Sequence, residues 1–202
     1  MTPPPGSAGP RASVTFVLEL DKLKGVTRRT QPLGLSRYEN SAEHSWQIAL
    51  LAMSLVPLAA APVDVDRVVR MLLVHDVGEI DAGDTIVYQE AGQAERKAAE
   101  RAGAVRVLGL APEPFRSEAI ALWEEFEAEA TPEARFANAV DRAMPVLLNL
   151  ANNGQSWREN GIRHEQVVRR VGPQVRAGCP ALWDYLEQEL AGAQARGWFG
   201  AA

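Results

Sequence analysis

Apolar residues recur every three or four positions through most of this 202-residue chain, which is the spacing of one face of an α-helix. No segment alternates apolar and polar residues in the way that a half-buried β-strand does. The helical pattern covers eight stretches: 13–26, 41–60, 64–80, 93–110, 112–130, 131–152, 164–178 and 180–197. The sequence therefore predicts an all-α protein that folds as a single compact helical bundle.

The helix predicted over 64–80 carries polar residues on its apolar face. Asp64 is the expected N-cap, and no Gly or Pro follows it before Gly78. At about 100° per residue, the apolar stripe of this helix continues into three polar side chains: His75, Asp76 and Glu79. The opposite side of the last turns is apolar as well, so we expect this end of the helix to be buried all round.

His44 and Asp141 lie on the apolar faces of two other predicted helices. Asn40, with Glu43 three residues later, has the pattern of a capping box, which places His44 in the first turn of its helix. A Thr-Pro pair at 131–132 predicts the start of the helix that carries Asp141. Both polar residues have apolar neighbours one turn away, which indicates that they point inward.

Imidazole and carboxylate groups are costly to bury unless each finds a hydrogen bond or a metal. A single inward His is more often a core histidine bonded to a carbonyl group, and a single buried Asp is more often a cap or an ion-pair partner. Four such residues on three helices favour a metal site instead: His44, His75, Asp76 and Asp141. Two His and two carboxylates suit Mn, Co, Fe, Ni or Zn better than Ca or Mg, so we expect one divalent metal.

Composition narrows the partners of the chain. The net charge is −5 and no run of Lys and Arg exceeds two residues, so neither nucleic acid nor a membrane is an expected partner. The Pro/Gly/Ser-rich residues 1–13 do not resemble a signal peptide and are expected to be flexible, ahead of one domain over residues 14–196. The single Cys179 favours a reducing, cytoplasmic location.

The order of these residues, a His, then His-Asp, then a distant Asp, resembles the HD-domain superfamily of metal-dependent phosphohydrolases. The stretches RYENSAEHSWQIALLA and HDVGEIDAGD, with the helix around Asp141, closely resemble the branch that contains bacterial 5′-deoxynucleotidases and their eukaryotic relatives. The resemblance covers residues 15–190. It implies that the four ligands hold one metal, that Glu79 assists the attacking water or protonates the leaving group, and that Asp84 binds the sugar hydroxyl.

Arginines in the loop before the first ligand helix are the candidates for binding phosphate. In the branch that the chain resembles, this loop carries an Arg-Trp pair. Here the stretch is Arg28-Arg29-Thr30, so Arg29 corresponds to the phosphate-binding Arg and the aromatic residue is absent. Arg28 and Arg37 are alternatives for the same role, and ordinary surface arginines would account for each of them equally well. The base of the substrate therefore stays open.

The chemistry of these residues suits hydrolysis of a phosphate monoester. A divalent metal polarises phosphoryl oxygens and makes water nucleophilic near neutral pH, Glu79 can orient that water or move a proton, and an arginine can clamp the phosphate. Among the three histidines of the chain, none lies between Asp76 and Asp141, where two-metal HD enzymes need further ligands. We therefore expect a mononuclear site and place His164 on the surface.

We expect an enzyme that removes phosphate from a nucleoside 5′-monophosphate, with a deoxynucleotide favoured. One alternative is a phosphatase for another small phosphate ester or for a nucleoside triphosphate in a biosynthetic pathway. A second alternative is a non-catalytic nucleotide-binding HD module, against which the retention of all four ligands and Glu79 argues. Aromatic residues near the C-terminus suggest a homodimer: Trp183, Tyr185, Trp198 and Phe199.

Overall fold

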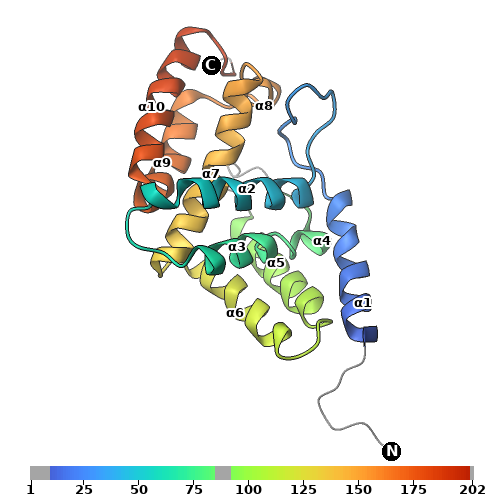
Figure 1. The fold of residues 1–202 in the computed structure, drawn as a ribbon. Helices are drawn as coiled ribbons and strands as arrows, with labels where there is room; N and C mark the ends of the chain where they lie inside the picture. The colour runs from blue at the N-terminus through green and yellow to red at the C-terminus, as the bar shows by residue number, and fades with distance from the viewer. Residues whose placement is uncertain (1–9, 85–91, 201–202) are drawn as a thin grey trace, which may run out of the picture.

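The computed structural model describes residues 10–84 and 92–200, without the side chain of Gln93. Within these ranges every regular element is a helix (Figure 1). The elements are α1 (Pro10–Leu20), the 3-10 helix η1 (Asp21–Gly25), α2 (Ser41–Leu55), the 3-10 helix η2 (Val56–Leu58), α3 (Val65–Val74), α4 (Glu79–Ala82), α5 (Gln93–Leu108), α6 (Phe115–Ala128), α7 (Pro132–Ala151), α8 (Gln155–Glu159), α9 (His164–Gly178) and α10 (Pro180–Ala195). The prediction of an all-α fold is confirmed.

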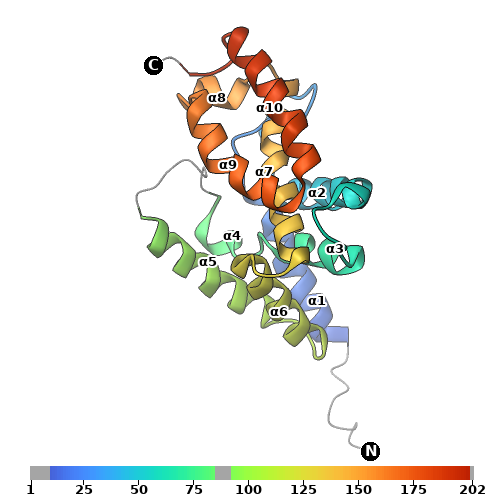
Figure 2. The same cartoon turned by 90° about the vertical axis from the view of Figure 1, so that its left-hand side faces the viewer.

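The helix α7 forms the centre of the molecule. It packs against α9 and α10 on one side and against α2, α3 and α6 on the other (Figures 1 and 2). Small residues such as Ala137, Ala139 and Ala143 are fully buried along it, so neighbouring helices can approach closely. The middle of α7 is therefore a place that helices from both halves of the chain reach.

The predicted starts of three helices are confirmed. The Asn40 side chain accepts from the backbone N–H of Glu43 at 3.0 Å, and the Glu43 carboxylate accepts from the Asn40 N–H, which completes a capping box. Asp64 caps α3 and Thr131 caps α7. Each cap satisfies backbone donors that have no partner within the helix.

The helix predicted over 64–80 is broken in two, so that part of the prediction is wrong. Helix α3 ends at Val74, a turn follows, and α4 begins at Glu79. The cause lies in a close crossing with α5: a Cβ on Gly78 would lie 2.2 Å from the carbonyl oxygen of Glu100, and a Cβ on Gly103 would lie 2.5 Å from that of Gly78. The two backbones can approach this closely only because both positions are glycine. His75 and Asp76 lie in the turn between α3 and α4.

Two segments differ from expectation: the start of α1 and the loop after α7. The predicted flexible segment, residues 1–13, lies mostly outside the described residues, but Pro10 already begins α1. A helix that was not predicted, α8, interrupts the loop expected after α7. No helix in the described ranges combines the length and apolar character that crossing a membrane requires.

The C-terminal aromatic residues pack mainly on their own chain. Trp183 is fully buried, Phe199 stacks on Trp157 with ring centroids 4.4 Å apart, and Trp198 packs against the core. His164, expected on the surface, is partly buried with its ring against Phe199 at 5.3 Å. Of the four aromatic residues from which a dimer was inferred, Tyr185 is the one that is exposed.

Candidate active site

Three of the four predicted ligands meet in the interior, beside the centre of α7. His44 comes from the first turn of α2, His75 from the turn after α3 and Asp141 from the middle of α7, and one ligand atom of each lies within 4.8 Å of the others. The Oδ1 atom of Asp141 lies 2.9 Å from His44 Nε2 and 3.6 Å from His75 Nε2. Both imidazoles are buried.

Asp76 completes this group from the neighbouring position. Its Oδ1 lies 3.0 Å from His75 Nε2, and its Oδ2 accepts a hydrogen bond of 3.0 Å from Arg28 Nη1. Asp76 therefore lies between the imidazole of His75 and the guanidinium of Arg28.

The donor set fits a divalent cation. His75 Nδ1 lies 2.8 Å from the carbonyl oxygen of Leu72, so this nitrogen carries the hydrogen and Nε2 offers a lone pair. Nε2 is buried without a hydrogen-bond partner in the described chain, although carboxylate oxygens lie beside it. Two imidazoles and two carboxylates form the mixed nitrogen and oxygen set of a transition metal.

The electrostatics of the site also favour a positive charge there. Burial by itself would lower the pKa of His75, but the carboxylates of Asp76 and Asp141 outweigh it and raise the pKa to about 9. Burial would raise the pKa of Asp141, but its hydrogen bond to His44 and the nearby charge of His75 hold it well below the ordinary value. Buried negative charge of this kind is stable only beside a cation.

Of the three arginines expected to bind phosphate, Arg28 is the one that lies inside the site. Its side chain is 13% exposed and its Nη1 also lies 3.8 Å from Asp84 Oδ1. Burial would lower the pKa of the guanidinium, but Asp76, Asp84 and Glu79 raise it above the ordinary value, so it stays charged. A bridge between Thr27 and Asn40 fixes the loop that carries it.

The other two arginines lie elsewhere. Arg29 lines the cavity beside Arg28 but is exposed, and its carbonyl oxygen lies 3.5 Å from Gln155 Nε2. Arg37 does not line the cavity, and its guanidinium pairs with Glu43 at 2.5 and 2.8 Å. The structure therefore does not bring Arg37 to the site, because the capping box of α2 holds it outside.

Glu79 and Asp84 line the same cavity as Asp76 and Arg28. Glu79 accepts a hydrogen bond of 2.6 Å from the Ser41 hydroxyl, and burial, followed by the charge of Asp76, raises the pKa of Glu79 well above the ordinary value. Burial also raises the pKa of Asp84, although Arg28 opposes the shift. A carboxyl group with a raised pKa can hold a proton near neutral pH.

A cavity of about 300 Å³ is lined by three of the four predicted ligands, His75, Asp76 and Asp141, and by Arg28, Glu79 and Asp84, whereas His44 lies behind them and does not line it. Residues of α5, α8 and α9 line this cavity, and in Figure 2 α5 lies below α8 and α9. Further cationic side chains line the wall: Arg29, Arg96, Lys97, Arg142 and Arg170. Carboxylates line the same wall in similar number, Glu100, Glu127 and Glu129 among them, and a cavity of this volume accepts a small molecule.

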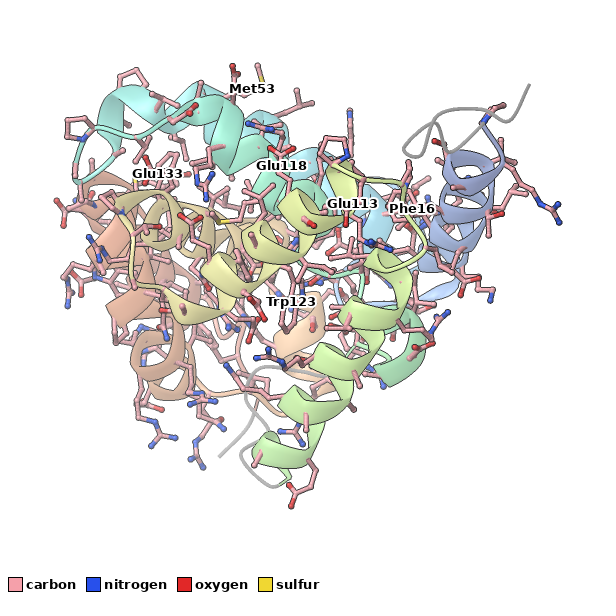
Figure 3. All side chains as sticks on the ribbon, turned by 90° about the horizontal axis from the view of Figure 1, so that it is seen from below. Phe16, Met53, Glu113, Glu118, Trp123 and Glu133 are labelled. Atoms are coloured by element: carbon pink, nitrogen blue, oxygen red, sulfur yellow. The ribbon has the colours of Figure 1, made fainter. Side chains whose placement is uncertain are left out.

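Several residues of the site carried no usable signal in the sequence. Trp123 lies in the interior on α6 (Figure 3) and its indole N–H donates to the carbonyl oxygen of His75 at 2.9 Å, while the ring of Phe126 packs 4.9 Å from the His75 ring. Their helical spacing predicted only a core face. Glu39 and Ser41 lie in or beside the capping sequence, where a polar residue is ordinary.

Comparison with known proteins identifies relatives of the whole domain. Residues 20–183 match the model of the HD domain. A solved structure, a predicted metal-dependent phosphohydrolase from Magnetospirillum magnetotacticum MS-1, is 40% identical with a TM-score of 0.87 over 95% of this chain and 98% of that one. A Pyrococcus horikoshii protein, 21% identical with a TM-score of 0.58 over 90% of this chain and 98% of its own, shares the fold.

Curated relatives carry the name of an activity. The 5′-deoxynucleotidase HDDC2 of Homo sapiens is 29% identical over 140 residues, which is 69% of this chain and 67% of that protein. The 5′-deoxynucleotidase HDDC2 of Danio rerio is 27% identical over 136 residues, 65% of this chain and 66% of that protein. The chain thus spans about two thirds of the length of these curated relatives.

Proposed function

Because the chain belongs to the HD domain family, we propose that it is a metal-dependent phosphohydrolase that removes phosphate from a nucleoside 5′-monophosphate, with a deoxynucleotide preferred. The observation that carries the proposal is the meeting of His44, His75 and Asp141 in the interior, next to a cavity that His75, Asp141 and the mostly buried Arg28 line. The names of the curated relatives and of the Magnetospirillum structure support it.

His44, His75, Asp76 and Asp141 would hold one divalent metal, with Mn, Co, Fe, Ni and Zn as the candidates. When bound, the metal supplies Lewis acidity toward phosphoryl oxygens and toward the attacking water. Contacts within the chain orient two of these side chains: the Leu72 carbonyl orients His75, and Arg28 orients Asp76. Such preorganisation avoids the cost of moving the ligands on binding.

Arg28 would bind the phosphate, in place of the Arg29 expected from the sequence. It stays charged and is held between Asp76 and Asp84, so a phosphate that displaced part of this pairing would form charge-assisted hydrogen bonds. Arg29, exposed at the cavity wall, would add charge without a fixed geometry. Arg37 has no part in binding, since Glu43 holds it away from the cavity.

Glu79 would hold the proton that the reaction moves. Its raised pKa favours the protonated form of the carboxyl group, and the Ser41 hydroxyl fixes the orientation of this group. Asp84, whose carboxylate reaches the same cavity, would accept a hydrogen bond from a sugar hydroxyl. Acid–base catalysis of this kind contributes about 100-fold to 10,000-fold to the rate.

Phosphate release from a panel of substrates tests the proposal. The panel pairs a deoxyribo- and a ribonucleoside 5′-monophosphate of the same base with a nucleoside triphosphate and a simple phosphate ester. We expect the highest kcat/KM on the deoxynucleoside monophosphate, and Asp84→Asn should change the ratio between the two sugars. No phosphate release from any monophosphate would contradict the proposal and favour a non-catalytic nucleotide-binding module, whereas preference for the triphosphate or the simple ester would favour a biosynthetic phosphatase.

We also propose a cytoplasmic homodimer, but through a different surface from the C-terminal aromatic residues. The outward face of α2 exposes large apolar side chains one and two turns apart: Trp46 at 63%, Leu50 at 49% and Met53 at 56%. Met53 projects from the edge of the molecule in Figure 3.

The single Cys179 is buried, which accords with a reducing compartment.

A further inference from the structure

Glu39 is a buried acid that the proposed mechanism does not use. It is 1% exposed although it lies in the loop before α2, and a carboxyl group in such a place is costly unless nearby groups compensate it. The backbone fixes its position, because the Glu39 N–H donates to the Thr30 carbonyl at 2.9 Å and the Arg28 N–H donates to the Glu39 carbonyl at 3.0 Å.

One oxygen of Glu39 faces three donors. The Thr30 hydroxyl donates to Oε1 at 2.5 Å, Arg28 Nε lies 3.5 Å from the same atom, and His44 Nδ1 lies 3.8 Å from it. The first of these is a hydrogen bond, whereas the other two are longer than one. Glu39 thus stands between the arginine and one of the histidines of the candidate site.

The position of Glu39 bears on the tautomer of His44. Its Nδ1 is buried and has no hydrogen-bond partner among the described residues, while its Nε2 faces Asp141. If Nε2 is to offer a lone pair to a cation, Nδ1 must carry the hydrogen, and an acceptor on that side selects this tautomer. Glu39 Oε1, 3.8 Å from Nδ1, is the carboxylate oxygen that the structure places on that side.

Arg28 is held from the same side. Its Nη1 faces Asp76 and Asp84, and its Nε faces Glu39, so carboxylates on two edges restrict rotation of the guanidinium. A planar group held in this way loses less conformational freedom when it binds phosphate.

We infer that Glu39 is a positioning residue which orients both the metal ligand His44 and the phosphate-binding Arg28, and so couples the metal site to the phosphate site. The inference rests on the proposed function, since it assumes that His44 binds metal and that Arg28 binds phosphate. Glu39 itself touches neither ligand. Its carboxylate acts through the two side chains beside it.

The test measures metal affinity as well as kinetics in Glu39→Gln, which keeps the shape of the side chain and removes its charge. Competition with a chelator should give Mn²⁺ or Co²⁺ binding that is about 10-fold to 100-fold weaker than in the wild type. At saturating metal, KM for a deoxynucleoside 5′-monophosphate should rise by more than kcat falls, because Arg28 is less well held.

Glu125→Gln is the matched control. Glu125 is also mostly buried and pairs with an arginine, but it joins α3 and α6 away from the cavity. The control should lose stability and keep the metal affinity and KM of the wild type. Should Glu39→Gln fail to fold, Glu39→Asp keeps the charge but withdraws it from His44, and should also weaken metal binding about 10-fold.

Unchanged metal affinity in the Glu39 variant, beside a wild type that binds metal, would overturn this inference alone. Equal loss of metal affinity in Glu125→Gln would overturn it too, because the effect would then follow general destabilisation. A wild type that binds no metal would overturn the proposed function, and this inference with it.

Discussion

At the scale of single residues, Arg28 and Arg37 belong to the same loop but have opposite surroundings. Arg28 is buried among carboxylates of the site, whereas Arg37 is exposed and paired with Glu43. Arg28→Ala should lower kcat/KM roughly 100-fold, since it removes a preorganised charge from a desolvated site. Arg37→Ala should leave kcat/KM near the wild-type value and change the free energy of unfolding little, because an exposed ion pair contributes little to stability. Equal kinetics of the two variants would contradict the assignment of Arg28.

A second variant should distinguish the role of Glu79 from that of the metal ligands. Glu79→Gln removes the proton-holding carboxyl group but leaves the four metal-binding residues in place. We expect metal content to stay at the wild-type level while kcat falls about 100-fold or more. Elemental analysis and steady-state kinetics on the same preparation measure both quantities. Loss of metal together with activity would make Glu79 a ligand instead.

The sequence identified the site residues that belong to helices with a clear apolar face. His44 and Asp141 lie on regular helices, so their inward direction followed from helical spacing, and their meeting is confirmed by the structure. Arg28 and Arg29 are neighbours in an irregular loop, where no periodicity tells which side chain points inward. The orientation comes from the pairing of that loop with Glu39 and Asn40, which depends on contacts across 10 or more residues.

At the scale of helices, Glu125 ties three of them together. It accepts from Arg67 Nε on α3 at 3.0 Å and from the hydroxyl of Thr131, the cap of α7, at 2.6 Å. These hydrogen bonds, the one from Arg67 foremost, lower the pKa of Glu125 below the ordinary 4.5 although burial opposes them. A carboxyl group with a lowered pKa stabilises the fold above that ordinary value, and the contribution is lost as pH falls through the folded-state pKa.

Glu125→Gln should therefore lower the free energy of unfolding by about 1–2 kcal/mol at neutral pH. The difference from the wild type should shrink as the solution is acidified below the ordinary carboxyl pKa of 4.5, because the wild-type carboxylate is then protonated too. Urea unfolding at neutral and acid pH measures both differences. A difference that persists undiminished in acid would show that shape or packing, rather than charge, is the cause.

The break between α3 and α4 also belongs to this scale. Apolar spacing predicted one helix because spacing reports which face is buried and does not report how closely another backbone approaches. The turn arises where Gly78 and Gly103 let α4 and α5 touch, and Gly103 is distant in sequence. Cap residues, in contrast, act within one turn, which is why Asn40, Asp64 and Thr131 were predicted correctly.

For the whole molecule, the apolar face of α2 predicts association of two chains. Light scattering at micromolar concentration should give twice the chain mass of 22.0 kDa. Trp46→Glu combined with Met53→Glu should return the mass to that of one chain, since charge on a buried apolar interface is costly. Tyr185→Glu, on the exposed C-terminal aromatic residue, should leave the dimer intact. A wild-type mass near 22.0 kDa would contradict the homodimer.

The most direct test of the account is the metal content of the wild type and of Asp141→Ala, measured after reconstitution with Mn²⁺ or Co²⁺ and together with phosphate release from a deoxynucleoside 5′-monophosphate. The wild type should hold about one metal per chain, the number that a four-residue donor set predicts, and release phosphate only in the loaded state. Asp141→Ala should hold none and be inactive, because it loses a carboxylate shared by both histidines. A wild type without metal, or one that hydrolyses the nucleotide equally well after chelation, would contradict the account.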